Sequence, residues 1–274
     1  WTTLTPDHLE RHGSLEAYRA IKRGLLERSQ CALFNADDPD LRQQRSSWQH
    51  GTWVSGEGAR PDGQPADLWI DAEGLVRNSV TTLFSADVLA MPGSHNRQNL
   101  LLVTAAALAV GLPPQQIADA LSTFPGVPHR LEQLGTLSGA TVFNDSKATN
   151  YDAAAVGLKA MQGPVVVLAG GSTKQGDAAG WLEELKRKAC SVVLFGAGAE
   201  ELHGLIKAAN FTGELTHRSD LANAVEEAVR SADALEASSL LLSPACASFD
   251  QYKDFEARGD HFKQLIQQVQ SGLN

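Results

Sequence analysis

Residues 164–171 read Pro-Val-Val-Val-Leu-Ala-Gly-Gly, a short apolar run that ends in two glycines. Consecutive aliphatic residues of this kind are typical of a strand that is buried on both faces of a sheet covered by helices. The glycines favour a tight turn at the carboxyl end of that strand. This stretch therefore predicts a parallel sheet within an α/β domain.

The same pattern continues on both sides of this stretch. Apolar runs that predict strands cover residues 140–143, 164–169, 191–195 and 239–243, and runs rich in Ala, Leu, Glu and Lys that predict helices cover residues 151–161, 178–189, 199–209 and 220–232. Strands that alternate with helices of about 10–15 residues indicate βαβ units. We therefore predict a Rossmann-like doubly wound sheet, in which ligands bind at the carboxyl ends of the strands.

The first 125 or so residues follow a different pattern. Their predicted elements are a helix over residues 14–28 with Ser14 as its N-cap, a strand over 31–35, a hairpin with strands at 68–70 and 74–76 around an Asp-Ala-Glu-Gly turn, and a helix over 96–110. Residues 124–128, Phe-Pro-Gly-Val-Pro, are typical of a hinge. We therefore predict an α/β domain over residues 1–126 and a second one over residues 127–274.

The composition restricts the class of protein. The chain has 274 residues and a net charge of −9, and 43% of its residues are hydrophobic, which is enough for packed cores. Its acidity argues against a nucleic-acid partner. The longest nearly apolar run, residues 100–112, is shorter than the ~20 residues that cross a bilayer. No signal peptide is visible, and the three cysteines are widely spaced, so we expect a cytoplasmic monomer without a membrane partner.

Lys22 lies on the apolar face of the first predicted helix. Leu15, Tyr18, Lys22 and Leu25 are spaced by three, four and three residues, so we expect this face to pack inward. A lysine at such a position most often extends its amine to solvent. Alternatively, a desolvated and nucleophilic amine reacts with carbon dioxide to form a carbamate, an anionic metal ligand. His8 is then a second ligand, and otherwise a loop or cap histidine.

Four segments at predicted strand ends have the residue types of binding loops. Residues 170–176 and 196–198 are glycine-rich but do not match the phosphate-loop or dinucleotide-binding patterns, so structural turns are favoured. Residues 144–150, Asn-Asp-Ser-Lys-Ala-Thr-Asn, suit a ribose or an acidic ligand as well as they suit a capped turn. Residues 243–250 allow backbone amides to approach a carboxylate, and Cys246 within them is interpreted as a small buried residue.

Several segments in order resemble the Mur ligases of peptidoglycan synthesis, and within them the branch that adds D-glutamate. They are residues 5–11 with Lys22, 93–99, 128–132, 144–150 and 242–259. The resemblance covers essentially the whole chain. It implies that the first domain is the latter part of a Mur ligase central α/β ATPase domain and that the second is the C-terminal domain.

The resemblance implies an ATP-dependent ligase that forms an amide. ATP would phosphorylate the carboxylate of UDP-N-acetylmuramoyl-L-alanine, and the amine of D-glutamate would attack the acyl phosphate. ATP makes the carboxylate oxygen a good leaving group, and Mg²⁺ neutralises charge during phosphoryl transfer. The implied cofactors are therefore ATP and Mg²⁺.

The resemblance also implies roles for individual residues. Lys22, His8 and Arg130 would be catalytic, with His8 and carbamylated Lys22 as magnesium ligands. Asn96, Asn99, Arg130 and Asp145 would bind ATP through its adenine, phosphate and ribose groups. Lys147, Thr149, Lys174, Ser248 and Phe255 would surround D-glutamate and the new amide, where cationic and hydroxyl groups suit an acidic amino acid.

The chain also departs from this family. Neither an N-terminal domain for uridine diphosphate nor a Gly-Lys-Thr/Ser phosphate loop is found in these 274 residues, which begin at Trp1 rather than Met. We therefore expect a part of a longer polypeptide that is inactive by itself. The alternatives are another Mur ligase or a folylpolyglutamate synthase, and a non-catalytic module that binds a nucleotide or an amino acid.

Overall fold

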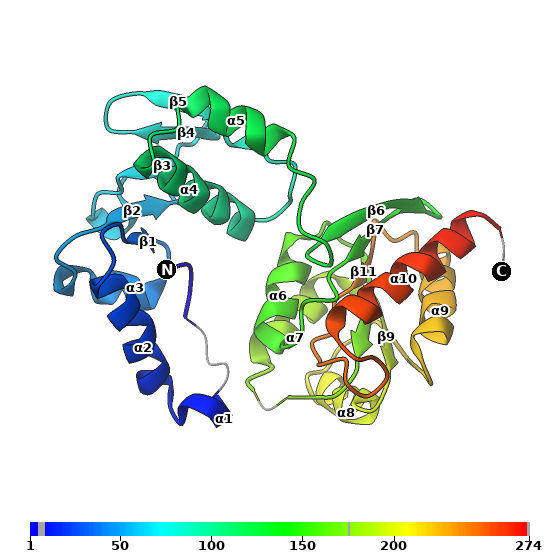
Figure 1. Cartoon of the computed structure of the whole chain (residues 1–274). Helices are drawn as coiled ribbons and strands as arrows, with labels where there is room; N and C mark the ends of the chain where they lie inside the picture. The colour runs from blue at the N-terminus through cyan, green and yellow to red at the C-terminus, as the bar shows by residue number, and fades with distance from the viewer. Residues whose placement is uncertain (5–8, 175, 273–274) are drawn as a thin grey trace. The chain divides into compact units, whose positions relative to one another are not determined.

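The computed structural model describes residues 1–4, 9–174 and 176–272. The chain divides into two compact units, Trp1–Pro125 and Gly126–Asn274. Each unit contains its own β-sheet (Figure 1). Each also has its own hydrophobic clusters.

The first unit is built on a five-stranded mixed sheet. Its strands lie in chain order as β1 (Leu33–Asn35), β2 (Thr52–Ser55), β3 (Leu68–Ile70), β4 (Leu75–Asn78) and β5 (Thr82–Ser85). Strands β1 to β3 are parallel, and β3 to β5 are antiparallel. Oδ1 of Asp71 accepts hydrogen bonds from the amides of Glu73 (3.1 Å) and Leu75 (2.8 Å), which stabilises the β3–β4 turn. The predicted hairpin is confirmed.

Helices pack against this sheet and extend from it. In the described residues they are α1 (Leu9–His12), α2 (Leu15–Glu27), α3 (Pro39–Gln43), α4 (Ser94–Ala109) and α5 (Pro114–Ser122), with short 3-10 helices η1 (Arg45–Ser47), η2 (Pro61–Gly63) and η3 (Ala86–Val88). Leu100 and Leu101 of α4 are buried in one cluster with Val54 of β2. A second cluster contains Phe34 and Trp53, whose ring centroids lie 4.7 Å apart. Burial of these apolar groups holds the unit together.

The second unit is built on a six-stranded sheet. The strand order is β10 (Glu214–Arg218), β9 (Ala189–Phe195), β8 (Val165–Gly170), β11 (Ser239–Leu242), β7 (Ala140–Asn144) and β6 (Glu132–Leu137). Neighbouring strands are parallel except for β6, which pairs antiparallel with β7. The chain runs outward from β8 through β9 to β10 and then returns to β11, which lies between β8 and β7. This reversal of direction makes the sheet doubly wound.

Helices cover both faces of this sheet (Figure 1). Those of the second unit are α6 (Tyr151–Ala160), α7 (Ala179–Lys188), α8 (Ala199–Ala208), α9 (Leu221–Ala234) and α10 (Phe255–Gln270). One face contributes Val165 and Val167 to a core with α6, α7 and α8. The other face contributes Val166 and Leu168 to a core with α9 and α10. The prediction that residues 165–168 form a strand buried on both faces is confirmed.

Trp181 of α7 is the largest fully buried side chain of the second unit. Its relative exposure is 1%, and its ring centroid lies 5.5 Å from that of Tyr151 on α6. The two rings join α6 and α7 over one face of the sheet. Aromatic pairs in this geometry add to the stabilisation that comes from buried area.

The predicted fold class is confirmed, and the four predicted strands of the second unit are present with ends shifted by one or two residues. Strands β6 and β10 were not predicted. Both lie at the edges of the sheet and include exposed polar residues, which weakens the apolar pattern of a strand. Within the described ranges, no helix combines the length and apolar character that crossing a membrane requires.

Candidate functional site

Most of the predicted site residues of the second unit lie at the carboxyl ends of its parallel strands. Residues 145–150 follow β7, residues 171–174 follow β8, residues 196–198 follow β9, and residues 243–250 follow β11. Because these strands are parallel, the four segments lie at one edge of the sheet. This edge is therefore the candidate site of the second unit.

Asp145 is buried beneath this edge. Its relative exposure is 7%, and its carboxyl accepts hydrogen bonds from the amide of Leu131 (3.2 Å) and from Oγ of Ser243 (3.1 Å). Burial raises the pKa of Asp145 to about 7, although these hydrogen bonds and the charge of Arg130 favour the ionised form. In this conformation, contact with a ribose would require Asp145 to leave its partners.

Two of the residues predicted at the D-glutamate site are in direct contact. Nζ of Lys147 lies 3.9 Å from the centroid of the Phe255 ring, a cation–π distance. Oγ of Ser146, the residue before Lys147, donates a 2.8 Å hydrogen bond to the carbonyl of Phe255. The backbone amide of Thr149 donates to the carbonyl of Lys147 (2.9 Å). The structure thus brings the segment after β7 and the start of α10 together.

A backbone bridge joins the segments that carry Lys174 and Ser248. Ser172 and Ala247 exchange two backbone hydrogen bonds of 2.8 Å and 2.9 Å. Lys174 is exposed and Ser248 is buried at 2% exposure. The close approach requires a glycine at position 171, since a Cβ there would lie 2.1 Å from the carbonyl oxygen of Ala247.

The buried guanidinium of Arg258 joins the segments that follow β7, β8 and β11. Arg258 is fully buried, and it donates hydrogen bonds to the carbonyls of Ser146 (2.8 Å), Gly170 (3.3 Å) and Cys246 (3.1 Å) and to Oγ of Ser146 (3.0 Å). Burial lowers its pKa to about 10, so it remains charged at neutral pH. One cation thus holds the ends of β7, β8 and β11.

The sequence prediction did not single out Arg258. Its signal is an arginine on the apolar face of a helix, because Phe255, Gly259 and Phe262 share that face of α10. Cys246 fits the interpretation as a small buried residue, since burial raises the pKa of its thiol to about 12 and keeps it neutral.

Arg130 lies in the segment that enters the second unit. It is exposed, whereas the neighbouring His129 and Leu131 are each buried at 6% exposure. The arrangement of this turn presents the Arg130 side chain at the surface, where a guanidinium can bind phosphate.

In the first unit, Asn96 and Asn99 lie on the first turns of α4. Asn96 is buried, and its Nδ2 donates a 2.7 Å hydrogen bond to the carbonyl of Pro92. The exposed Asn99 donates through Nδ2 to Oδ1 of Asn96 at 3.4 Å. Asn96 therefore stabilises the start of α4. Asn99 is exposed, whereas Asn96 is buried.

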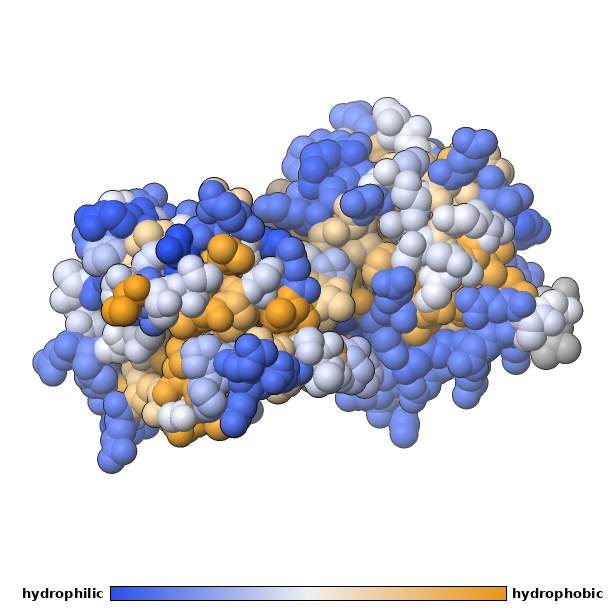
Figure 2. Space-filling view, turned by 90° about the horizontal axis from the view of Figure 1, so that it is seen from above, coloured by the Kyte–Doolittle hydropathy of each residue, from blue (hydrophilic) through white to orange (hydrophobic). Residues whose placement is uncertain are grey.

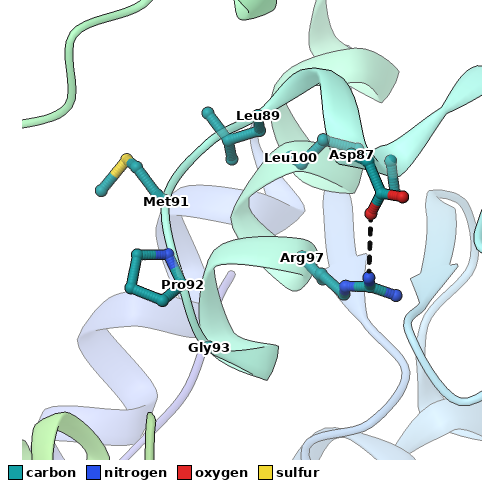
Figure 3. Close-up of a pocket in the computed structure, with 8 residues that line it drawn as sticks. Asp87, Leu89, Met91, Pro92, Gly93, Arg97 and Leu100 are labelled. Carbon is teal, nitrogen blue, oxygen red and sulfur yellow. Dashed lines mark hydrogen bonds and ion pairs between the residues drawn. The ribbon is translucent and has the colours of Figure 1, made fainter. Parts of the chain in front are cut away.

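A pocket of about 170 Å³ lies beside the start of α4 (Figure 3). Its lining residues come from the segment before α4 and from α4 itself: Ala86, Asp87, Leu89, Met91, Pro92, Gly93, Arg97 and Leu100. Arg97 and Asp87 form an ion pair of 3.2 Å between exposed side chains at its edge. The predicted contacts Asn96 and Asn99 do not line this pocket, so its walls do not by themselves identify an adenine site.

The prediction that the apolar face of α2 packs inward is wrong for this structure. No residue of α2 is buried, and Leu25 is 64% exposed. Lys22 is half-buried, with Nζ 5.0 Å from the centroid of the Tyr18 ring. An amphipathic pattern shows which face is apolar, but it does not supply a partner for that face. Exposed hydrophobic residues also occur on another face of the first unit, the one that is seen from above in Figure 2.

The residues that the structure describes do not form a complete magnesium site. His8, the second predicted ligand, lies outside the described residues. Among the residues that are described, no group of three or more His, Cys, Asp and Glu side chains is arranged to hold a metal ion. Since Mg²⁺ prefers several oxygen ligands, Lys22 alone does not hold it.

Two protein-family models match the chain. The model of the Mur ligase middle domain matches residues 1–107, and that of the Mur ligase, glutamate ligase domain, matches residues 129–246. Both models describe domains of Mur ligases, and together they match most of the chain.

Curated relatives match over the whole chain. The UDP-N-acetylmuramoylalanine–D-glutamate ligase of Parasynechococcus marenigrum (strain WH8102) is 78% identical over 274 residues, which is 100% of this chain and 59% of that protein. The protein with the same name from Prochlorococcus marinus (strain MIT 9313) is 65% identical over 97% of this chain and 58% of its own length. The chain spans somewhat less than three fifths of the length of these relatives.

Solved structures with low sequence identity share the fold. The UDP-N-acetylmuramate-alanine ligase of Thermotoga maritima has a TM-score of 0.66 at 18% identity, over 99% of this chain and 59% of that chain. The folylpolyglutamate synthase of Mycobacterium tuberculosis has a TM-score of 0.66 at 14% identity, over 96% of this chain and 62% of that chain. At such identities the likeness concerns the fold alone.

Proposed function

Because the chain belongs to the Mur ligase family, we propose that it forms the middle and C-terminal parts of an ATP-dependent ligase that joins D-glutamate to UDP-N-acetylmuramoyl-L-alanine. The observation that carries this proposal is the 78% identity over all 274 residues to a ligase of that name. A cytoplasmic location belongs to the same proposal. The fold is shared with folylpolyglutamate synthases and does not distinguish the substrates.

The proposed reaction has two steps. An oxygen of the alanyl carboxylate attacks the γ-phosphorus of ATP, and ADP leaves. The amine of D-glutamate then attacks the acyl carbon, the bond to the phosphate oxygen breaks, and phosphate leaves while the amine loses a proton. Positioning and charge neutralisation supply most of the catalysis in such a transfer.

We assign the phosphate of ATP to Arg130 and the two carboxylates of D-glutamate to the strand-end edge of the second unit. Lys147 and Lys174 supply positive charge there, and Thr149 and Ser248 supply hydroxyl groups. The contact of Lys147 with Phe255 limits the directions that its ammonium group can take. Asn99 remains a proposed adenine contact, together with Asn96 as its support.

Magnesium, when bound, would neutralise negative charge on the phosphates. We propose His8 and a carbamate on Lys22 as two of its ligands, with the remaining ligands outside the described residues. The intact mass of the metal-bound enzyme at high bicarbonate tests the carbamate. A mass that corresponds to a free amine would contradict it.

We further propose that the 274-residue chain neither hydrolyses ATP nor ligates D-glutamate by itself. The test compares phosphate release by this chain with that of the product of the complete reading frame, each with ATP and the UDP-linked substrate. D-glutamate should stimulate release by the longer product and not by this chain. Stimulation by L-alanine or another amino acid in its place would contradict the D-glutamate assignment.

A further inference from the structure

The turn that carries Arg130 has an unusual backbone conformation. His129 and Leu131 have φ values of 61° and 45°, in the left-handed region that residues other than glycine rarely adopt. Both side chains are buried at 6% exposure, and Arg130 between them is exposed. The position of Arg130 therefore depends on contacts that hold its two neighbours in an unfavourable conformation.

Two carboxyl groups supply these contacts. Oε2 of Glu132 accepts a 3.0 Å hydrogen bond from the amide of His129, and Oδ1 of Asp145 accepts one of 3.2 Å from the amide of Leu131. The carbonyl of His129 accepts a hydrogen bond from the amide of Lys147 (3.1 Å). Each left-handed residue thus has its amide bound to a carboxyl group.

Glu132 is itself held by two other elements. Its Oε1 lies 2.7 Å from Nζ of Lys263 on α10, and its Oε2 lies 3.3 Å from Nδ2 of Asn144 at the end of β7. Burial favours the neutral acid, but the hydrogen bonds from Lys263 and the His129 amide lower the pKa of Glu132. The ionised carboxylate thus joins the turn to β7 and α10.

We infer that Glu132 and Lys263 are a positioning pair for Arg130. Lys263 fixes the carboxylate of Glu132, and Glu132 fixes the amide of His129, so that the turn presents Arg130 in one position. The inference rests on the proposed role of Arg130 in binding the phosphate of ATP. Neither member of the pair needs to touch a substrate.

A pair that only stabilises the fold would behave differently. Its loss would lower the thermal stability without changing the KM for ATP. Loss of a positioning pair changes the KM for ATP, or kcat/KM for ATP, while the KM for D-glutamate stays the same. The distinction is possible because the segments of Lys174 and Ser248 are held by the Ser172–Ala247 bridge. The side chain of Lys147 keeps its contact with Phe255, although its backbone amide binds the carbonyl of His129.

The kinetic test uses the product of the complete reading frame. We expect Glu132→Ala to lower kcat/KM for ATP about tenfold, the effect of losing one charge-assisted hydrogen bond, and to leave the KM for D-glutamate within about twofold. Glu132→Gln keeps an acceptor for the His129 amide and should recover much of this loss. Glu183→Ala removes the exposed Glu183–Lys186 pair on α7 as the matched control and should change neither constant.

A second test uses hydrogen exchange in the 274-residue chain. The His129 amide should exchange about tenfold faster in Glu132→Ala and also faster in Lys263→Met, and Glu183→Ala should leave it unchanged. Unchanged exchange at His129, or faster exchange with unaltered kinetics for ATP, would overturn the inference. If the wild-type ligase shows no ATP-dependent ligation, the proposed function fails instead, and exchange still decides whether Glu132 holds the turn.

Discussion

The backbone amide of Ala197 donates a 3.0 Å hydrogen bond to Oδ2 of Asp250. Ala197 lies in the turn after β9, and Asp250 lies two residues after Ser248 in the segment after β11. Together with the Ser172–Ala247 bridge, this bond holds the Ser248 segment on both sides. The position of Ser248 therefore depends on two neighbouring strand-end segments.

Removal of this carboxylate should loosen the Ser248 segment. We expect Asp250→Ala to lower the free energy of unfolding of the second unit by about 1 kcal/mol, the usual net value of one hydrogen bond. The amide of Ala197 should also exchange faster with solvent. Asp250→Asn keeps an acceptor oxygen and serves as the control. Equal exchange rates at Ala197 in the wild type and Asp250→Ala would contradict the prediction.

Replacement of Arg258 should be among the most destabilising changes in the chain. Arg258→Met removes the donors for three buried carbonyl groups, and each unsatisfied buried group costs about 1–3 kcal/mol. We therefore expect a loss of several kcal/mol in urea unfolding. Arg187→Met on the exposed face of α7 is the matched control, and its effect should be well below that of Arg258→Met. Similar losses for the two variants would show that the buried hydrogen bonds contribute little.

Asp145 should make stability depend on pH. Its pKa is about 7 in the folded chain and about 3.9 when unfolded, so between these values the folded state binds a proton that the unfolded state lacks. The favourable contribution of the protonated form is complete below about pH 4 and is lost as the pH rises through 7.

The matched variant for this titration is Asp145→Asn, which resembles the protonated acid at every pH. We expect the wild type to lose stability relative to Asp145→Asn between about pH 4 and pH 7, as measured by denaturant unfolding at several pH values. Parallel pH profiles for the two proteins would mean that Asp145 is ionised throughout.

Gly170 should tolerate no side chain. Its φ is 148°, and a Cβ would lie 1.9 Å from the backbone oxygen of Phe195. We expect Gly170→Ala to cost more than about 2 kcal/mol in urea unfolding, because backbone atoms on two neighbouring strands would have to move apart. Gly180→Ala is the control, since a Cβ there meets open space and alanine favours helix. A cost for Gly170→Ala as small as that of the control would contradict the close approach of β8 and β9 at this position.

Much of the second unit could be predicted because its central strands are apolar throughout. Residues 165–168 face two helical layers, so their sequence has no polar position to obscure the strand. Strand β10 lies at the edge of the sheet beside β9 and includes exposed Glu214 and His217, which explains why its pattern was missed. The N-cap at Ser14 was predicted correctly, because its side chain accepts a 3.1 Å hydrogen bond from the amide of Ala17.

The candidate site was less predictable, because its organisation depends on contacts between distant residues. Lys147 and Phe255 were both predicted from the resemblance, but their contact joins residues more than a hundred positions apart. The roles of Arg258 and Lys263 follow from burial and from partners on other elements, which a single sequence does not show. The spacing on α2 likewise identified an apolar face without showing whether anything packs on it.

The buried pair of Trp181 and Tyr151 gives the second unit its own optical signal. The other four tryptophans, at positions 1, 48, 53 and 69, all belong to the first unit. The tryptophan emission of a Trp181→Phe chain would therefore come from the first unit alone, and the difference from the wild-type spectrum would isolate the tryptophan signal of the second unit. With two separate cores, the transitions need not coincide during denaturation, and this subtraction assigns each fluorescence change to one half of the chain.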